Sequence, residues 1–315
     1  MLDKKLVFME HDGAIDDLLS QILLLTMPHV EVVGINVTPA DCFIEPAIES
    51  TYKILDKFGR AHIPIGRNDF NGINAFPSEW RARPEIVNAL PDLINVEYSI
   101  NPYDLPTAFE LLERTLESAD RPITILMTGP CSNLVQVLKE RPTLQNKIER
   151  VIWMAGAFRT GGNVQTYQHD GSAEWNVYWD PISAAVLFQM ELPLVCIPLD
   201  VTNHVPVQME FLSLLATRDK LNLSNLACQF WAMTIDTIPN YYYTYYMWDV
   251  LATSFIAMEE HFKTQKVKAK VSIRPPNAGQ TILDSEGYEL NIATEVDKDA
   301  FYSFLYDSLD LAILT

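Results

Sequence analysis

Apolar runs of strand composition alternate with segments of helical periodicity along the first two thirds of the chain. The runs that predict strands are 5–9, 30–37, 123–127, 151–154 and 194–197. The segments that predict helices are 16–27, 45–58 and about 181–189, with Pro28 and Gly59 just past the first two. The strand runs at 123–127 and 151–154 are apolar on both faces, as buried parallel strands are. The alternation therefore predicts an α/β fold, a single doubly wound domain with a mostly parallel central sheet.

The last third of the chain has a different pattern. From about 206 to 260 it is mainly helical, interrupted by the aromatic stretch 241–246, which we expect to form part of a flap over the site. Further strands and a final helix are expected at 267–273, 288–292 and about 299–311. Because no internal repeat or Pro/Gly/Ser-rich linker marks a boundary, we expect one domain over 1–315, with the helical segment contributing to the site.

The chain is acidic, with 41 Asp and Glu residues against 23 Lys and Arg residues and a formal net charge of −18. This balance repels phosphate backbones and anionic lipid, which argues against nucleic-acid polymers and membrane surfaces as partners. The apolar runs are far shorter than the roughly 20 residues that span a bilayer. Without a secretory signal pattern, and with four scattered cysteines, the sequence favours a reducing, cytoplasmic location.

Acidic residues gather directly after the first predicted strand, where the chain reads EHDGAIDD from Glu10 to Asp17. Ligands of open α/β sheets bind at the carboxyl ends of the strands. Helix capping explains one or two acids in a first helical turn. Crowding Asp12, Asp16 and Asp17 together is costly unless a cation neutralises them. Carboxylates without His or Cys partners favour Ca²⁺ or Mg²⁺ over zinc, although a phosphatase with a strand-end Asp nucleophile fits this cluster equally well.

Later motifs separate these alternatives. They are Met127–Leu134 (MTGPCSNL), Met154–Ala157 (MAGA), Gly162–Val164 (GNV), Ala173–Pro181 (AEWNVYWDP), Leu199–Thr202 (LDVT) and Trp248–Asp249. Together with HDGxxDD at residues 11–17, they resemble the nucleoside hydrolases, which split the N-glycosidic bond of ribonucleosides. The resemblance runs in the same order from residue 5 to about residue 260, and it implies the nucleoside hydrolase fold.

The resemblance also implies a bound Ca²⁺ that anchors the ribose diol and the attacking water. Its ligands would be Asp12, Asp17, the backbone carbonyl of Thr128 and Asp249. Asp12 would in addition serve as the general base. A mixed set of carboxylate, carbonyl, water and hydroxyl oxygens is what Ca²⁺ accepts.

The sugar and the base would be held by further residues that match the family motifs. Asp16 and Asn176 would bind the 2′- and 3′-hydroxyls, and Asn163 and Glu174 would reach the 5′-hydroxyl. Met154 would line the sugar pocket. Trp175 joins the expected substrate-binding residues, and Asn176 and Trp248 join Asp12 among the expected catalytic residues.

The base-side residues look most like the purine-preferring inosine-adenosine-guanosine branch. Pyrimidine-preferring members usually have His where this chain has Trp248. Trp80 and Trp248 would stack on the base, and Asp41 would lie near it. The structural alternatives are core packing for the tryptophans and a turn role for Asp41, which follows Pro39 closely. His169 lies in the site loop but has no paired spacing, and we assign it no catalytic role.

These observations predict a Ca²⁺-dependent purine ribonucleoside hydrolase that releases ribose and free base, expected to be a homodimer as is typical of that branch. A broad-specificity or pyrimidine-preferring nucleoside hydrolase is the alternative within the family. A non-catalytic nucleoside- or calcium-binding protein is the alternative from another class. That alternative predicts loss of an acid at position 12, 16, 17 or 249, yet all four are present. The phosphatase alternative lacks an evident Lys or Ser/Thr set for phosphate.

Overall fold

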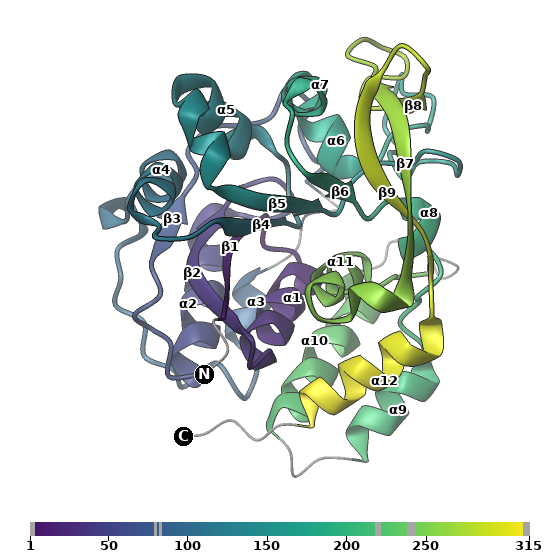
Figure 1. Cartoon of the computed structure of the whole chain (residues 1–315). Helices are drawn as coiled ribbons and strands as arrows, with labels where there is room; N and C mark the ends of the chain where they lie inside the picture. Colours follow the sequence, from purple (N-terminus) through teal and green to yellow (C-terminus); the bar gives the residue numbers. More distant parts are fainter. Residues whose placement is uncertain (1–3, 79–80, 82–83, 218–221, 238–243, 311–315) are drawn as a thin grey trace.

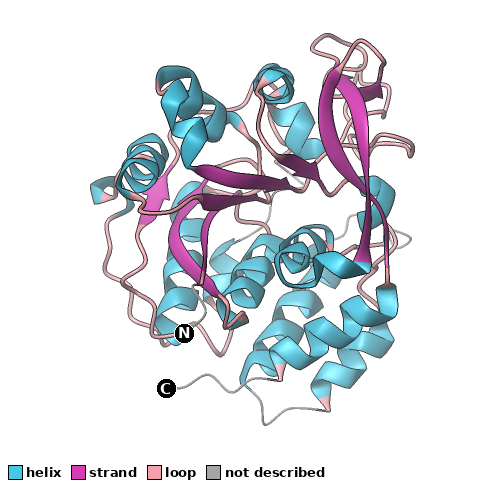
Figure 2. Ribbon diagram, viewed as in Figure 1, coloured by secondary structure: helices cyan, strands magenta, loops and turns pink. Residues whose placement is uncertain are grey.

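The computed structural model describes residues 4–78, 81, 84–217, 222–237 and 244–310. Within these residues, nine strands form one sheet in the order β3-β2-β1-β4-β5-β6-β9-β7-β8 (Figures 1 and 2). The strands are β1 (Lys5–His11), β2 (Val30–Val37), β3 (Ile65–Arg67), β4 (Ile123–Met127), β5 (Ile148–Trp153), β6 (Leu194–Cys196), β7 (Phe262–Val271), β8 (Thr281–Leu283) and β9 (Tyr288–Val296). Neighbouring strands from β3 through β9 pair in parallel, whereas β7 pairs antiparallel with β9 and β8.

Helices cover both faces of this sheet. They are α1 (Ile15–Thr26), α2 (Ile44–Lys57), α3 (Pro84–Asn88), α4 (Ala108–Ser118), α5 (Ser132–Glu140), α6 (Trp175–Trp179), α7 (Pro181–Gln189), α8 (Leu199–Thr202), α9 (Met209–Ala216), α10 (Asn222–Thr237), α11 (Trp248–Met258) and α12 (Lys298–Leu309). Short 3-10 helices lie at Pro102–Asp104, Pro142–Lys147 and Glu259–His261. In Figures 1 and 2, α4, α5 and α7 lie above the sheet, and α1, α2, α10, α11 and α12 lie below it.

The two apolar cores follow from the alternation of side chains along the central strands. On β1, Val7 and Met9 pack into the core shared with α1 and α11. Leu6 and Phe8 point to the other face and pack into the core shared with α4 and α5. Because both faces of the strand are buried here, residues 6–9 form a continuous apolar run. The predicted α/β fold with a mostly parallel sheet is therefore confirmed.

Some predicted element bounds agree with the structure and others do not. The predicted strands 30–37 and 123–127 and the helix 181–189 have the observed bounds of β2, β4 and α7. The strand predicted at 267–273 begins earlier, as β7 at Phe262, and ends at Val271. Its first half is exposed from Lys263 to Lys266, so it carries no apolar alternation that would mark it as a strand.

The parallel pairing determines where the site lies. Since β1, β4 and β5 are neighbours and run in the same direction, the loops that follow them leave the same edge of the sheet. Helices α1 and α11 pack against each other beneath this edge (Figure 1). The first turns of these two helices carry Asp16, Asp17 and Asp249.

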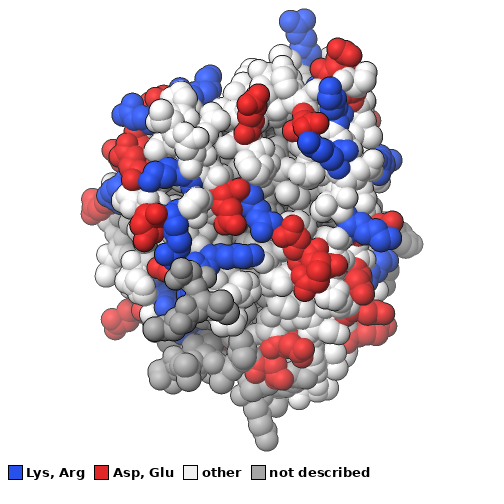
Figure 3. Space-filling model, in the orientation of Figure 1, with Lys and Arg blue, Asp and Glu red and all other residues white. Residues whose placement is uncertain are grey.

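The surface carries both signs of charge. On the face drawn in Figure 3, acidic and basic side chains are intermixed over the upper half of the molecule. Among the helices that the structure describes, none combines the length and the apolar character needed to cross a lipid bilayer.

Candidate active site and metal centre

Three buried carboxyl groups converge at the edge of the sheet. One oxygen from each of Asp16, Asp17 and Asp249 lies within 4.8 Å of the others. Burial, followed by the charge of Asp17, raises the pKa of Asp16 to about 6. Burial, followed by the charges of Asp16 and Asp17, also raises the pKa of Asp249. Such a cluster is stabilised by a cation, and its hard oxygen donors fit Ca²⁺.

Asp12 borders this cluster at the end of β1. Its backbone nitrogen lies 3.5 Å from Asp17 Oδ1, and its Oδ2 accepts a hydrogen bond of 3.3 Å from the backbone N–H of Asp41. Burial, followed by the charge of Asp17, raises the pKa of Asp12 well above its ordinary value. The three carboxylates that converge are thus those of Asp16, Asp17 and Asp249, and Asp12 lies beside them. The family resemblance instead implies that Asp12 is a metal ligand and that Asp16 binds the ribose.

The turn between Asp12 and α1 requires glycine. Gly13 has φ of +80°, and a Cβ added there would lie 2.5 Å from Cys42 Sγ. Both the conformation and the space at this position exclude a side chain. The turn places Asp12 and the first turn of α1 next to each other.

Asp17 both caps a helix and belongs to the carboxylate cluster. Its Oδ2 accepts a hydrogen bond of 2.8 Å from the N–H of Ala14, so it caps the start of α1. Its Oδ1 accepts a hydrogen bond of 2.5 Å from the Thr128 hydroxyl. Asp17 is therefore held in place by α1 and by the loop after β4 while it remains part of the carboxylate cluster.

Two of the expected sugar-binding residues, Glu174 and Asn176, lie at the start of α6. The side-chain amide of Asn176 donates to the carbonyl oxygens of Thr128 and Met154, over 2.8 and 3.0 Å. Glu174 caps the helix, because its carboxylate accepts hydrogen bonds from the N–H groups of Asn176 and Val177 over 2.8 and 3.3 Å. Burial raises the pKa of Glu174 to about 7.

Asn163 and Trp175 lie in the same region but make different contacts. Asn163 Oδ1 accepts a hydrogen bond of 3.1 Å from the N–H of Trp175, which links the loop after β5 to α6. The indole of Trp175 packs against Phe76 and Tyr178, with ring centroids 4.3 and 5.5 Å apart. These contacts place Trp175 in a small apolar cluster under the loop.

Trp248, one of the two tryptophans expected to stack on the base, is the first residue of α11. Its indole N–H donates to Asn203 Oδ1 over 3.1 Å, and its ring contacts those of Tyr245 and Tyr246. Trp80 lies outside the described residues, and so does the part of the predicted flap from 241 to 243.

Tyr245 is a site residue to which sequence reasoning assigned no individual role. Its hydroxyl donates to Asp16 Oδ1 over 2.7 Å, and its ring lies 4.9 Å from that of Trp248. The available signal was its place near the end of the aromatic stretch, three residues before Trp248. Tyr245 thus connects the carboxylate cluster to the aromatic surface beside it.

Comparisons with known proteins identify the family of the chain. The model of the family described as "Inosine-uridine preferring nucleoside hydrolase" matches residues 7–303. The crystal structure of an inosine-uridine preferring nucleoside hydrolase from Bacillus anthracis is similar, with a TM-score of 0.89, 35% identity, and coverage of 97% of this chain and 99% of that chain. A purine-preferring ribonucleoside hydrolase from Gardnerella vaginalis shares the fold, with a TM-score of 0.80 at 20% identity over 97% of this chain and 98% of that chain.

A further relative is the pyrimidine-specific ribonucleoside hydrolase RihA of Escherichia coli O1:K1 / APEC, 27% identical over 214 residues. The matched region spans 65% of this chain and 63% of that relative. The names of the relatives include purine and pyrimidine preferences, so they support the family without separating its branches. The match over residues 7–303, together with the buried carboxylate cluster, shows that the chain belongs to the inosine-uridine preferring nucleoside hydrolase family.

Proposed function

We propose that this protein hydrolyses the N-glycosidic bond of ribonucleosides in a Ca²⁺-dependent reaction that releases ribose and the free base. The observation that carries the proposal is the convergence of Asp16, Asp17 and Asp249, all buried, beside Asp12 at the edge of the sheet. Buried carboxylates this close together are expected to bind a cation. Membership of the family indicates the class of reaction, hydrolysis of a nucleoside.

Asp12, Asp17, Asp249 and the carbonyl oxygen of Thr128 would hold the metal. A carbonyl oxygen has two lone pairs, so the hydrogen bond from Asn176 to Thr128 leaves this acceptor able to take a second partner. Asp17 is oriented by Thr128 and Ala14, which supports its role as a ligand of fixed position. When bound, Ca²⁺ would orient the substrate and promote deprotonation of water.

Asp12 would accept the proton of the attacking water. Water must lose a proton as it attacks the anomeric carbon, because the ribosyl group then develops oxocarbenium character. The position of Asp12 at the strand end, next to the carboxylate cluster, supports this assignment. Its ionised form is required for the step.

The ribose would be held by Asp16, Asn176, Asn163 and Glu174. The hydroxyl of Tyr245 already donates to Asp16 over 2.7 Å, and a ribose hydroxyl is a donor of the same kind. The contact of Asn163 and Glu174 with the start of α6 supports a shared role at one end of the sugar. We assign these two residues to the 5′-hydroxyl, with Met154 and Trp175 adjoining the sugar pocket.

Purine ribonucleosides are the proposed substrates, with Trp80 and Trp248 on the two faces of the base and Asp41 near it. The cluster of Trp248 with Tyr245 and Tyr246 next to Asp16 supports an aromatic surface for the base. A pyrimidine-preferring or broad-specificity enzyme is the competing substrate assignment, and the name of the RihA relative favours testing it.

Side-by-side rates for inosine, adenosine, guanosine, uridine and cytidine test the proposal, with 2′-deoxyinosine as the control. We expect the purine ribonucleosides to be hydrolysed fastest and the deoxynucleoside to be a poor substrate. Uridine faster than inosine would reject the purine assignment, and binding of all nucleosides without turnover would favour the non-catalytic alternative. A cytoplasmic homodimer of single-domain subunits completes the proposal, and light scattering would test the dimer.

A further inference from the structure

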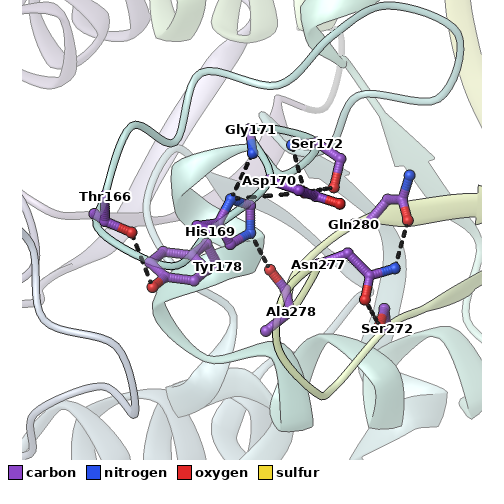
Figure 4. A network of polar contacts seen from close by, with 10 residues as sticks. All are labelled: Thr166, His169, Asp170, Gly171, Ser172, Tyr178, Ser272, Asn277, Ala278 and Gln280. Carbon is purple, nitrogen blue, oxygen red and sulfur yellow. Dashed lines mark hydrogen bonds and ion pairs between the residues drawn. The ribbon is translucent and has the colours of Figure 1, made fainter.

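The loop between β5 and α6 is packed against a segment that lies about one hundred residues further along the chain. This loop, residues 154–174, contains Asn163 and ends at Glu174. The remote segment is the turn 272–280 between β7 and β8. Figure 4 shows the polar contacts that join the two, with His169 between them.

His169 joins the loop to the turn through both ring nitrogens. Its Nε2 lies 2.9 Å from the carbonyl oxygen of Ala278, and its Nδ1 lies 3.0 Å from the backbone nitrogen of Gly171. Since a carbonyl can only accept and an amide N–H can only donate, the ring hydrogen lies on Nε2 and Nδ1 is the acceptor. Asp170 Oδ1 is 3.9 Å from Nδ1, but this oxygen accepts hydrogen bonds from Ser172 instead. The side chain of His169 is 3% exposed.

Further contacts fix the turn on the loop and on α6. The backbone N–H of Asp170 donates to the carbonyl of Pro276 over 3.0 Å. The ring of His169 meets that of Tyr178 edge-on, at 4.7 Å between centroids. A Cβ added at Gly279 would lie 2.6 Å from Tyr178 Cα, so the turn touches the backbone of α6.

The same hairpin also contacts the beginning of the loop. The hydroxyl of Thr281, the first residue of β8, donates to the carbonyl of Ala157 over 2.8 Å and accepts from its N–H over 3.0 Å. The turn itself is braced by hydrogen bonds of Asn277 to Ser272 and Gln280. The hairpin thus supports the loop near Ala157, at His169 and at α6, on both sides of Asn163 in the sequence.

We propose that His169 is a positioning residue, which holds the loop on the β7–β8 turn and thereby sets the selectivity of the site for the 5′-hydroxyl of its nucleoside. This inference rests on the proposed function, in which Asn163 and Glu174 bind that hydroxyl. His169 acts through these two residues and does not touch the substrate.

The variant His169→Phe tests the proposal, because it keeps an aromatic ring against Tyr178 and removes both hydrogen bonds. We expect KM for inosine to rise about tenfold, the scale of losing one or two neutral hydrogen bonds. KM for 5′-deoxyinosine should change less than about twofold, and kcat should change little on either substrate. His169→Gln, whose amide can still donate to Ala278, should restore part of the selectivity.

Tyr167→Ala is the matched control, because Tyr167 belongs to the same loop and is 92% exposed. This variant should leave both KM values unchanged. A purely structural role of His169 would affect both substrates alike. Equal changes for inosine and 5′-deoxyinosine in His169→Phe, or no change for either, would therefore overturn the proposed selectivity role.

Hydrogen exchange of the backbone amides of Asp170 and Gly171 provides a readout that does not need activity. In His169→Phe these amides should exchange at least about tenfold faster, since their acceptors are lost or displaced, and in Tyr167→Ala they should not. Unchanged exchange in His169→Phe would overturn the positioning role. If the native protein hydrolysed no nucleoside, the proposed function would fail, and the exchange rates would still decide whether His169 holds the loop.

Discussion

The side-chain amide of Asn176 bridges the ends of two neighbouring strands by donating to the carbonyl oxygens of Thr128 and Met154 over 2.8 and 3.0 Å. Thr128 follows β4 and Met154 follows β5. A residue proposed to hold the sugar therefore also orients a carbonyl proposed to hold the metal. Under these two proposed roles, substrate binding and metal binding would be coupled through this one carboxamide.

Asn176→Asp should weaken this bridge, because an ionised carboxylate cannot donate to either carbonyl. An unsatisfied buried acceptor costs about 1–3 kcal/mol. Since each kcal/mol shifts the unfolding temperature by roughly 2–4 °C, the Tm of the Ca²⁺-loaded protein should fall by about 2–12 °C. The control is Asn74→Asp, because the amide of Asn74 donates to one carbonyl, that of Tyr178, outside the carboxylate cluster. A shift no larger than that of the control would contradict the bridging role.

The metal-free protein should become less stable as the pH rises from about 4 to 7. Burial raises the pKa of Asp16 to about 6 and the pKa of Glu10 and of Glu174 to about 7. A carboxyl group with a pKa higher in the folded than in the unfolded state binds more protons when folded, so the free energy of unfolding falls with rising pH across this window. Thermal unfolding after thorough chelation, at pH 5 and pH 7, measures the effect, and a higher Tm at pH 7 would contradict it.

Calcium should reverse this loss at pH 7. At one hundred times its Kd, a ligand adds about 2.7 kcal/mol to the stability, which corresponds to an increase in Tm of about 5 °C or more. Asp249→Asn removes one of the repelling charges. This variant should therefore unfold at a higher temperature than the native protein when chelated, yet gain little from Ca²⁺. If Ca²⁺ raised the Tm of Asp249→Asn as much as it raises the Tm of the native protein, Asp249 would be excluded from the metal site.

Asp12→Ala should fold and lose most of its turnover. General-base catalysis contributes roughly 10²–10⁴-fold, and the loss of a metal ligand adds to that figure. Nucleoside binding should be partly kept, because the proposed sugar contacts lie on Asp16 and the start of α6. Steady-state rates and calorimetric titration with inosine, together with circular dichroism, separate these effects. Turnover near that of the native enzyme would exclude Asp12 as the base.

The sequence was sufficient for the parts of the fold whose burial leaves a local pattern. The strand β4 has no charged residue, β2 has only Glu31, and the bounds of both strands were predicted as observed. The exposed first half of β7 and the three-residue strand β3 are defined by pairing with distant strands, so nothing in their own composition marks them. For this reason the parallel part of the sheet was predicted, whereas the bounds of the antiparallel strand β7 were predicted only in part.

The same distinction applies to the site. The crowding of Asp16 and Asp17 was visible because these acids lie in one segment, and family motifs supplied Asp249. The contact of Tyr245 with Asp16 and that of His169 with Ala278 join residues that are far apart in the sequence. Neither contact has a characteristic spacing, so it became apparent only when α1, α11 and the β7–β8 turn were placed in space.

Trp248→Ala should slow inosine more than a ribonucleoside with an activated nitrophenyl leaving group. Indole does not serve as a proton donor at neutral pH, so Trp248 would act by stacking on the purine, more strongly in the transition state than in the bound substrate. Aromatic pairs contribute about 0.5–1.5 kcal/mol beyond burial, which corresponds to a selective loss of about 2- to 10-fold. Because Trp248 precedes Asp249, damage to the metal site should slow both substrates alike, and the comparison separates the two effects.

Asn203→Ala is the matched control for this experiment. It removes the hydrogen-bond acceptor of the Trp248 indole N–H and leaves the ring itself in the site. We expect a small loss that is similar for inosine and for the nitrophenyl substrate, since the stacking face is retained. Equal losses on the two substrates in Trp248→Ala would show that this tryptophan only packs the pocket. A selective loss confined to Trp248→Ala would assign the leaving-group effect to its aromatic face.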